Sequence, residues 1–181
     1  MSKQVRAASL VAMAALLLSG CTTGATPQPT PSYTPKVYVN APLTGMPFEE
    51  GTRPSLNGPS VACKIDNVHT ETLKANINRT DLVYVEMVEG GLTRLVAVWH
   101  SDLPTAVGPV RSIRPMDPDI ISPFGGIVCY SGGQWVFMKM MLATNVFNAS
   151  ETSEQENGTF SRTKDRIAPH NVLVDVAKLA A

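Results

Sequence analysis

The chain has 181 residues, 17% of them charged, and its 15 basic side chains balance its 15 acidic ones. This length is close to that of one typical domain, and zero net charge without a basic run gives no electrostatic basis for binding nucleic acid. The charge content is too low for a disordered acidic segment. Three cysteines are too few for a fold built mainly on disulfides.

The first 20 residues have the pattern of a bacterial export signal. A basic start precedes an apolar stretch at 7–18, which is shorter than the roughly 20 residues that a membrane-spanning helix needs. The sequence LSGC at 18–21 matches the lipobox, in which small residues precede the cleavage point and the cysteine thiol carries the lipid. We predict a signal peptide at 1–20 and a lipid on Cys21. Several acyl chains hold a protein stably on a membrane, so we expect this one at the cell membrane, on the extracytoplasmic side.

A tether and a single domain are expected after the lipidated cysteine. Residues 22–36 are rich in proline and threonine and cannot bury apolar surface, which is typical of an extended, disordered linker. We assign residues 21–41 to the lipidated cysteine and this tether, and residues 42–181 to a folded domain. No apolar stretch after the signal is as long as the about 18 residues that a membrane-spanning helix needs.

Hydrophobic patterning in the domain predicts strands mixed with short helices. Strands are expected at 61–65, 82–88, 92–99 and 126–130. Short helices are expected at 70–77, 117–121, 134–142 and 172–179, with a polar surface loop at 148–161. The Glu-Gly-Gly sequence at 89–91 predicts a hairpin, and the spacing of Trp135, Met138 and Leu142 predicts the core-facing side of their helix. Together these elements predict an α/β or α+β fold, with a single mixed β-sheet packed with short helices.

Six short sequence blocks follow one another along the domain. They read PLTG at 42–45, KIDN at 64–67, DLVYVE at 81–86, VEGGLTR at 88–94, GPVRSIR at 108–114 and RIAPHN at 166–171. In this order they resemble the YerB-like family of bacterial envelope lipoproteins, which carry a domain of unknown function. The resemblance implies an envelope location and a related fold, and it supplies no reaction. Family members are about twice as long, so residues 42–181 are expected to be the N-terminal domain, truncated at its C-terminal end.

Polar and charged residues border the predicted strands and make up the candidate ligand-binding set: Asp66, Asn67, Glu86, Glu89, Arg94, Arg111, Arg114, Arg166, His170 and Asn171. Arg111 and Arg114 could grip a carboxylate or phosphate as a fork. Glu86 and Arg94 could form an ion pair across the hairpin, and His170 adds the residue type that exchanges protons near neutral pH. This set predicts binding of an anionic or glycan component of the envelope. A buried arginine–carboxylate network that only holds the fold is the alternative interpretation.

A hydrolase acting on cell-wall, ester or glycoside bonds is an alternative from another functional class. Ser131 lies at a predicted strand-to-helix turn before two glycines, and Asp165 and His170 follow in the order of a catalytic triad. Ser131 could instead cap the next helix. Glu86 and Glu89 could serve glycoside cleavage, although residues three apart on a strand face opposite sides. We therefore favour a binding module over an enzyme.

No cofactor or metal site is predicted, because the three histidines are scattered and no Cys-x-x-Cys or His-x-His spacing occurs. The expected partners are the membrane, through the lipid, and an envelope ligand or protein. A scaffold for another envelope protein is the third functional hypothesis.

The two cysteines of the domain, Cys63 and Cys129, lie on predicted strands. In an oxidising compartment they could form a disulfide. Packing as two small hydrophobic side chains is the slightly favoured alternative.

Overall fold

The computed structural model describes residues 33–68 and 74–181. Among the described residues, Lys36–Ala181 form one compact unit. The predicted signal peptide, Cys21, most of the tether and the start of the predicted helix at 70–77 lie outside the described residues. The elements of the fold all belong to the unit Lys36–Ala181.

The described residues form nine strands and three α-helices, which are joined by short 3-10 turns. The strands are β1 (Tyr38–Asn40), β2 (Pro47–Glu49), β3 (Val61–Asp66), β4 (Leu82–Met87), β5 (Thr93–Trp99), β6 (Ile127–Tyr130), β7 (Phe147–Ser150), β8 (Phe160–Arg162) and β9 (Val172–Val174). The α-helices are α2 (Asp117–Ile121), α3 (Trp135–Leu142) and α4 (Val176–Leu179).

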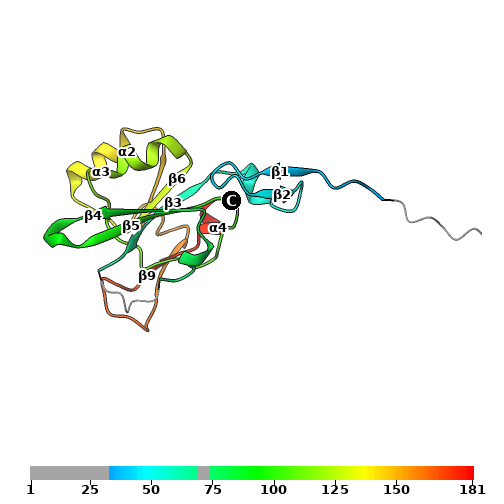
Figure 1. The fold of residues 1–181 in the computed structure, drawn as a ribbon. Coiled ribbons are helices and arrows are strands. Elements are labelled where there is room, and N and C mark those ends of the chain that lie inside the picture. The colour runs from blue at the N-terminus through cyan, green and yellow to red at the C-terminus, as the bar shows by residue number, and fades with distance from the viewer. Residues whose placement is uncertain (1–32, 69–73) are drawn as a thin grey trace, which may run out of the picture. The chain divides into compact units, whose positions relative to one another are not determined.

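The central feature is a five-stranded mixed sheet with the order β4-β5-β3-β6-β7 (Figure 1). β4, β5 and β3 pair antiparallel, whereas β3, β6 and β7 pair parallel. The hairpin between β4 and β5 turns at Glu89–Gly91, where Gly90 and Gly91 both have a φ of 71° that glycine adopts without steric cost. Two further two-stranded sheets pair β1 with β2 and β8 with β9. The predicted mixed sheet with short helices is confirmed, in its α+β form.

Both faces of the sheet are covered, and β3 shows how the sequence divides between them. Every residue of β3 is buried, and alternate side chains point to opposite faces. Val61, Cys63 and Ile65 join the core cluster that β9 and α4 complete, while Ala62 joins the cluster that α2 and α3 cover. Figure 1 shows the helices α2 and α3 on one side of the sheet and β9 on the other.

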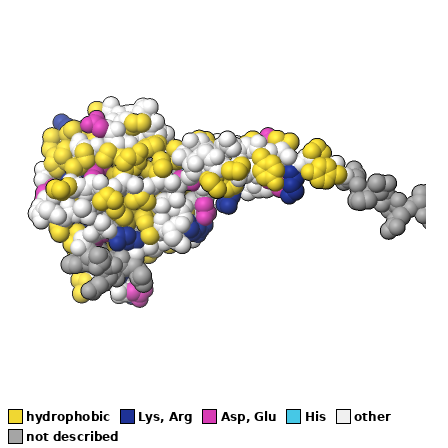
Figure 2. Space-filling view, in the orientation of Figure 1, with side chains coloured by type: hydrophobic (Ala, Val, Ile, Leu, Met, Phe, Trp, Pro, Cys, Tyr) yellow, Lys and Arg dark blue, Asp and Glu magenta, His cyan; other side chains and the backbone are white. Residues whose placement is uncertain are grey.

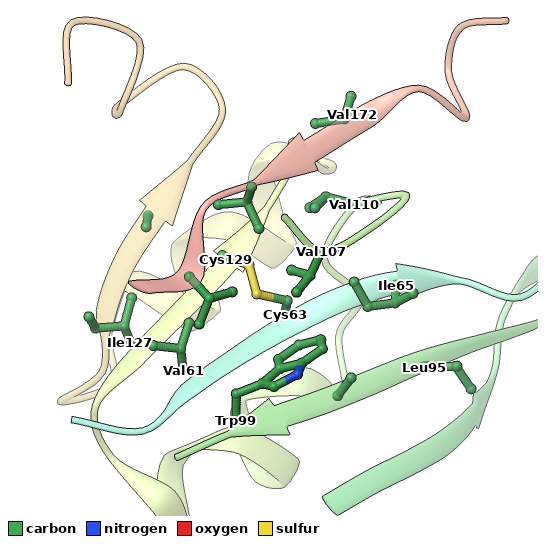
Figure 3. Close-up of a cluster of buried hydrophobic side chains, with 14 residues drawn as sticks. Val61, Cys63, Ile65, Leu95, Trp99, Val107, Val110, Ile127, Cys129 and Val172 are labelled. Carbon is green, nitrogen blue, oxygen red and sulfur yellow. A yellow bond between two sulfur atoms is a disulfide. The ribbon is translucent and has the colours of Figure 1, made fainter. Parts of the chain in front are cut away.

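The two cysteines of the domain form a disulfide. β3 and β6 are parallel neighbours whose register places Cys63 opposite Cys129, with their Cα atoms 4.5 Å apart. Figure 3 shows the bridge among buried side chains that include Trp99. The favoured expectation of two unpaired cysteines is wrong, because strand order brings together two segments that lie 66 residues apart in the chain.

Four expected elements differ from the structure. Of the helix predicted at 70–77, the described residues 74–77 form no α-helix, because Ala75 pairs with Gly108 and a 3-10 turn begins at Ile77. The predicted helix at 172–179 is instead the strand β9 followed by the single turn α4, because residues 172–174 pair with β8. The predicted loop at 148–161 begins within β7 and ends within β8. β1 lies inside the segment assigned to the tether at 21–41, where it pairs with β2.

The helix α3 turns a different side to the core than its spacing predicts. Trp135 and Leu142 are exposed by 63% and 56%, whereas Met141 is fully buried and Phe137 and Met138 pack against the core. Nearly every position of α3 is apolar, so its period does not define one buried stripe. Figure 2 shows hydrophobic side chains gathered on the surface where Figure 1 places α2, α3 and β4.

Candidate functional site

Polar side chains converge at one end of the sheet, where β3 and β4 finish and β5 begins. The register places Arg94 opposite both Asp66 of β3 and Glu86 of β4. The segment 108–114 runs along the same end of β3, because the backbone N–H of Asp66 donates to Pro109 O (2.9 Å) and that of Arg111 donates to Lys64 O (2.8 Å). Pairing of the backbone therefore brings the predicted arginines to the end of the sheet.

The deepest layer of the site is a cluster of Lys64, Glu86 and Asp117, named here the buried triad. Its side chains are exposed by 0%, 4% and 0%. Lys64 Nζ lies 2.6 Å from Asp117 Oδ1 and also forms an ion pair with Glu86 Oε1. The backbone N–H of Arg114 donates to the second oxygen, Asp117 Oδ2, at 2.5 Å. This layer ties β3 to β4 and to the first residue of α2.

Burial favours the uncharged forms in this layer. It lowers the pKa of Lys64 to about 8, although the neighbouring Asp117 carboxylate opposes the shift. Burial likewise raises the pKa of the Asp117 carboxyl group above its ordinary value. Both directions follow from the cost of holding a charge away from water.

Above the buried triad lies a partly exposed layer of Asp66, Arg111 and His170. Asp66 Oδ2 accepts a hydrogen bond from His170 Nδ1, and Arg111 Nε lies 3.9 Å from the same oxygen. Arg111 also donates from Nη1 to the carbonyl oxygen of Pro169 at 3.2 Å. Asp66 is almost fully buried, while the side chains of Arg111 and His170 are exposed by 18% and 31%. The side chains of Arg111 and His170 are therefore partly accessible to solvent, while the carboxylate that they contact is buried.

Arg94 and Arg114 complete the group, which we name the arginine cluster: Arg94, Arg111 and Arg114. Arg94 is buried and donates from Nη1 to Ser112 O at 2.7 Å, while its Nε has no hydrogen-bond partner among the described residues. Arg114 donates from Nε to Glu89 Oε2 at 2.9 Å and keeps 15% of its side chain exposed. Burial, together with the positive charges of Arg114 and Arg111, lowers the pKa of Arg94 to about 10. The site thus gathers three guanidinium groups at one place, beside the carboxylates of Asp66 and Glu89.

Acid is expected to destabilise the domain through Asp66. Burial would raise the pKa of this carboxyl group, but hydrogen bonds from His170 and from the backbone N–H of Val68, with the charge of Arg111, hold the pKa below its ordinary value. A depressed pKa contributes stability above the unfolded value that is lost as the pH falls through the folded value. Urea midpoints measured from pH 6 downward should therefore fall below about pH 4 in the wild type. Asp66→Asn should lack this part of the decline, and an identical decline in both proteins would contradict the assignment.

The structure brings most of the candidate set together and leaves some members aside. The members that meet at the end of the sheet are Asp66, Glu86, Glu89, Arg94, Arg111, Arg114 and His170. Asn67 donates to Thr93 Oγ1 (2.8 Å) and Asn171 accepts from Arg162 (2.9 Å), so these amide bonds are to residues outside the arginine cluster. Arg166 is half-buried in the segment that precedes His170. Glu86 is the cross-strand neighbour of Arg94, as predicted, but its ion pair is with Lys64.

The residues of the hypothetical catalytic triad have other partners. Asp165 accepts a hydrogen bond from Thr163 Oγ1 at 3.0 Å, and the carboxylate at His170 Nδ1 is that of Asp66. Ser131 donates its backbone N–H to Arg111 O at 3.0 Å. The structure therefore pairs the histidine with a different aspartate from the one that chain order suggests.

Lys64 and Asp117 are site residues that sequence reasoning missed. Lys64 stands in the apolar run VACKID, where a lysine in a strand buried on both faces is itself a signal. Asp117 has the sequence pattern of a helix N-cap, but the N-cap is Met116 and the Asp117 side chain points inward to Lys64. An isolated charge in a buried strand requires an opposite charge beside it, and that requirement could have prompted a search for its partner.

Neither a membrane span nor a metal site is found in the part of the chain that the structure describes. No helix among residues 33–68 and 74–181 is long and apolar enough to cross a bilayer. Over the same residues, no three His, Cys, Asp or Glu side chains are grouped as metal ligands. His69 lies outside these ranges.

The chain belongs to the DUF3048 family: the model of its N-terminal domain, described as a protein of unknown function, matches residues 43–181. The Bacillus subtilis (strain 168) protein YerB, named as a proposed lipoprotein, is 31% identical over 97 residues, which are 52% of this chain and 28% of that protein. The crystal structure of YerB from Bacillus subtilis matches with a TM-score of 0.68 and 25% identity, covering 78% of this chain and 47% of the solved one. The predicted family resemblance is confirmed. The chain spans less than half the length of these relatives.

Proposed function

We propose that this protein is a lipid-anchored component of the bacterial cell envelope whose domain binds an anionic ligand, a carboxylate or a phosphate, at the arginine cluster. The anchor is supported by the lipobox at 18–21 and by the likeness to a relative that is named as a proposed lipoprotein. The lipid on Cys21 would hold the domain at the extracytoplasmic side of the membrane. We therefore expect the ligand to be a component of the cell envelope.

The observation that carries the binding proposal is the convergence of three guanidinium groups on one end of the sheet. Arg111 and Arg114 keep part of their side chains in solvent, and the buried Arg94 has an Nε without a hydrogen-bond partner among the described residues. Guanidinium groups match carboxylates and phosphates because they donate two parallel hydrogen bonds. Each neighbouring arginine also makes the charge of the others less favourable, a cost that a bound anion would remove.

The surrounding groups favour a fixed geometry for this site. Asp66 is buried and holds the ring of His170 through Nδ1, so the imidazole has one orientation at the edge of the arginine cluster. The carbonyl oxygen of Pro169 accepts from Arg111 and fixes that guanidinium in the same way. Side chains held in place before binding lose less entropy when the ligand arrives.

Affinity measurements with Arg111→Ala and Arg114→Ala test the proposal. The probes are inorganic phosphate and soluble muropeptides, which carry carboxylates, titrated into the full chain by calorimetry. Each substitution should weaken binding of the responding probe by roughly tenfold, equal to about 1.4 kcal/mol, because a charge-assisted hydrogen bond is lost. A response to phosphate alone would assign a phosphate ligand, and a response to muropeptides alone would assign a carboxylate ligand.

Arg79→Ala is the matched control for these variants. Arg79 is likewise an arginine that pairs with a carboxylate, that of Asp102, and its side chain is 40% exposed. Its replacement should leave the affinity unchanged. The proposal fails if neither probe binds, or if the two site variants bind as well as the control does.

A further inference from the structure

The buried triad has a geometry that the binding proposal does not use. Lys64 Nζ lies 2.6 Å from Asp117 Oδ1, and neither side chain has any exposed surface. Glu86 touches the same nitrogen from β4, with 4% of its side chain exposed. An amine and two carboxyl groups are thus enclosed together, almost entirely away from solvent.

From this arrangement we propose that Lys64 and Asp117 become joined by an intramolecular amide bond, formed by the folded chain itself, with Glu86 carrying the proton. The bond would link Nζ of Lys64 in β3 to Cγ of Asp117 at the start of α2. It is a modification of the protein itself and is independent of any ligand at the arginine cluster.

The forms that must react are those that burial favours. An amine attacks only when it is uncharged, and a carboxyl group is an electrophile only when it is protonated. Burial lowers the pKa of Lys64 to about 8 and raises the pKa of Asp117. Transfer of one proton from the ammonium group to the carboxylate therefore produces the reactive pair, which a site without water stabilises relative to the ion pair.

The reaction is a condensation that releases water. The lone pair of Lys64 Nζ forms a bond to Asp117 Cγ, and the negative charge moves onto Oδ2. The Glu86 carboxylate takes a proton from the attacking nitrogen and passes it to the hydroxyl oxygen Oδ1, whose bond to Cγ then breaks. One amide and one water molecule result, and Glu86 ends as it began.

Each oxygen of Asp117 is placed for its part in this step. Oδ1 is the oxygen in contact with Nζ, the nitrogen that Glu86 Oε1 also contacts. Oδ2 accepts the backbone N–H of Arg114 at 2.5 Å, a donor that stabilises the negative charge of the tetrahedral intermediate. After the reaction Oδ2 becomes the amide oxygen and keeps that hydrogen bond.

Neighbouring charges are also compatible with the product. Loss of the charges of Lys64 and Asp117 leaves the Glu86 carboxylate opposite the Arg94 guanidinium across the hairpin. The remaining charges at this depth therefore balance, and no isolated ion is left in the interior.

Peptide mapping of the full 181-residue chain tests the proposal. The chain is unfolded, reduced, alkylated and digested with trypsin, which cleaves after Lys and Arg but neither before Pro nor at an acylated lysine. With the amide bond, cleavage after Lys64 disappears and peptide 37–74 stays joined to peptide 112–139. The joined pair should be lighter than the two separate peptides by one water molecule. Reduction is essential, because the disulfide Cys63–Cys129 connects the same two peptides.

Two variants complete the test. Glu86→Gln keeps the shape of the side chain but cannot carry the proton, so the two peptides should separate and the cut after residue 64 should return. Lys64→Arg keeps a positive charge but offers no amine to acylate, so it supplies the pattern of the unlinked chain. Separate peptides from the wild-type chain would overturn the proposal whether or not the variants fold. Joined peptides from Glu86→Gln would overturn the role of Glu86.

Discussion

Asp117→Ala is expected to lower the free energy of unfolding of the domain by about 3–5 kcal/mol, the cost of removing one member of a buried ion pair. Asp117 contacts Lys64 Nζ through one oxygen and accepts the Arg114 N–H through the other, and it has no exposed surface. Its removal leaves Lys64 in the interior with Glu86 as its remaining ion pair among the described residues. Urea denaturation, followed by circular dichroism, measures the change.

Asp119→Ala is the control for this prediction. Asp119 is exposed on the same helix, α2, so its replacement should change the free energy of unfolding by less than about 0.5 kcal/mol. Equal midpoints for the two variants would mean that the buried triad contributes nothing to stability.

Loss of the disulfide should have an effect of similar size. Replacing Cys63 and Cys129 together with alanine opens a loop whose ends are 66 residues apart, and the chain-entropy model gives a loss of up to about 4 kcal/mol. The measurement is the urea midpoint of the double variant against that of the oxidised wild type. Wild-type chain that has been unfolded and reduced should refold with the lower stability of the variant.

The disulfide and the proposed amide should not contribute independently. The link between residues 64 and 117 closes part of the loop that the disulfide encloses, so either bond shortens the loop left for the other. Loss of the disulfide should therefore cost more in the Asp117→Ala background than in the wild type. Equal losses in both backgrounds would argue that only one covalent link is present.

The elements that the sequence predicts well are those whose pairing is local. The strands at 82–88 and 92–99 and the hairpin between them are predictable because their alternation and the glycines at 89–91 act within a short stretch of chain. β9 is mistaken for the start of a helix at 172–179, because a strand of three residues is too short for its period of two to be told from a helical period of 3.6. Its strand conformation depends on β8 and on Val107, which pairs with Val174 from the other side.

The candidate site also has a part that local sequence patterns predict and a part that depends on contacts between distant segments. The arginines and Glu86 are found from the sequence because they border strands that it predicts. The inner partners are not, because the pairing of Lys64 with Asp117 spans 53 residues and depends on where α2 packs. The ring of His170 likewise meets Asp66 across 104 residues. Residue types and local patterns show which side chains are available for chemistry, and only strand order shows which of them touch.

The bridge between β3 and β6 has a mechanical consequence. If the chain is pulled from its two ends, as a molecule held by a membrane anchor and bound at its other end would be, the force passes from Cys63 to Cys129 across a Cα distance of 4.5 Å. The 66-residue segment between them corresponds to about 220–240 Å of extended backbone. It bears no force even after the domain has unfolded. That segment carries Lys64, Asp66, Glu86 and the arginine cluster. An oxidised domain should thus lengthen under load by that much less than a reduced one, and the part of the chain that bears the buried triad and the arginine cluster should carry no tension.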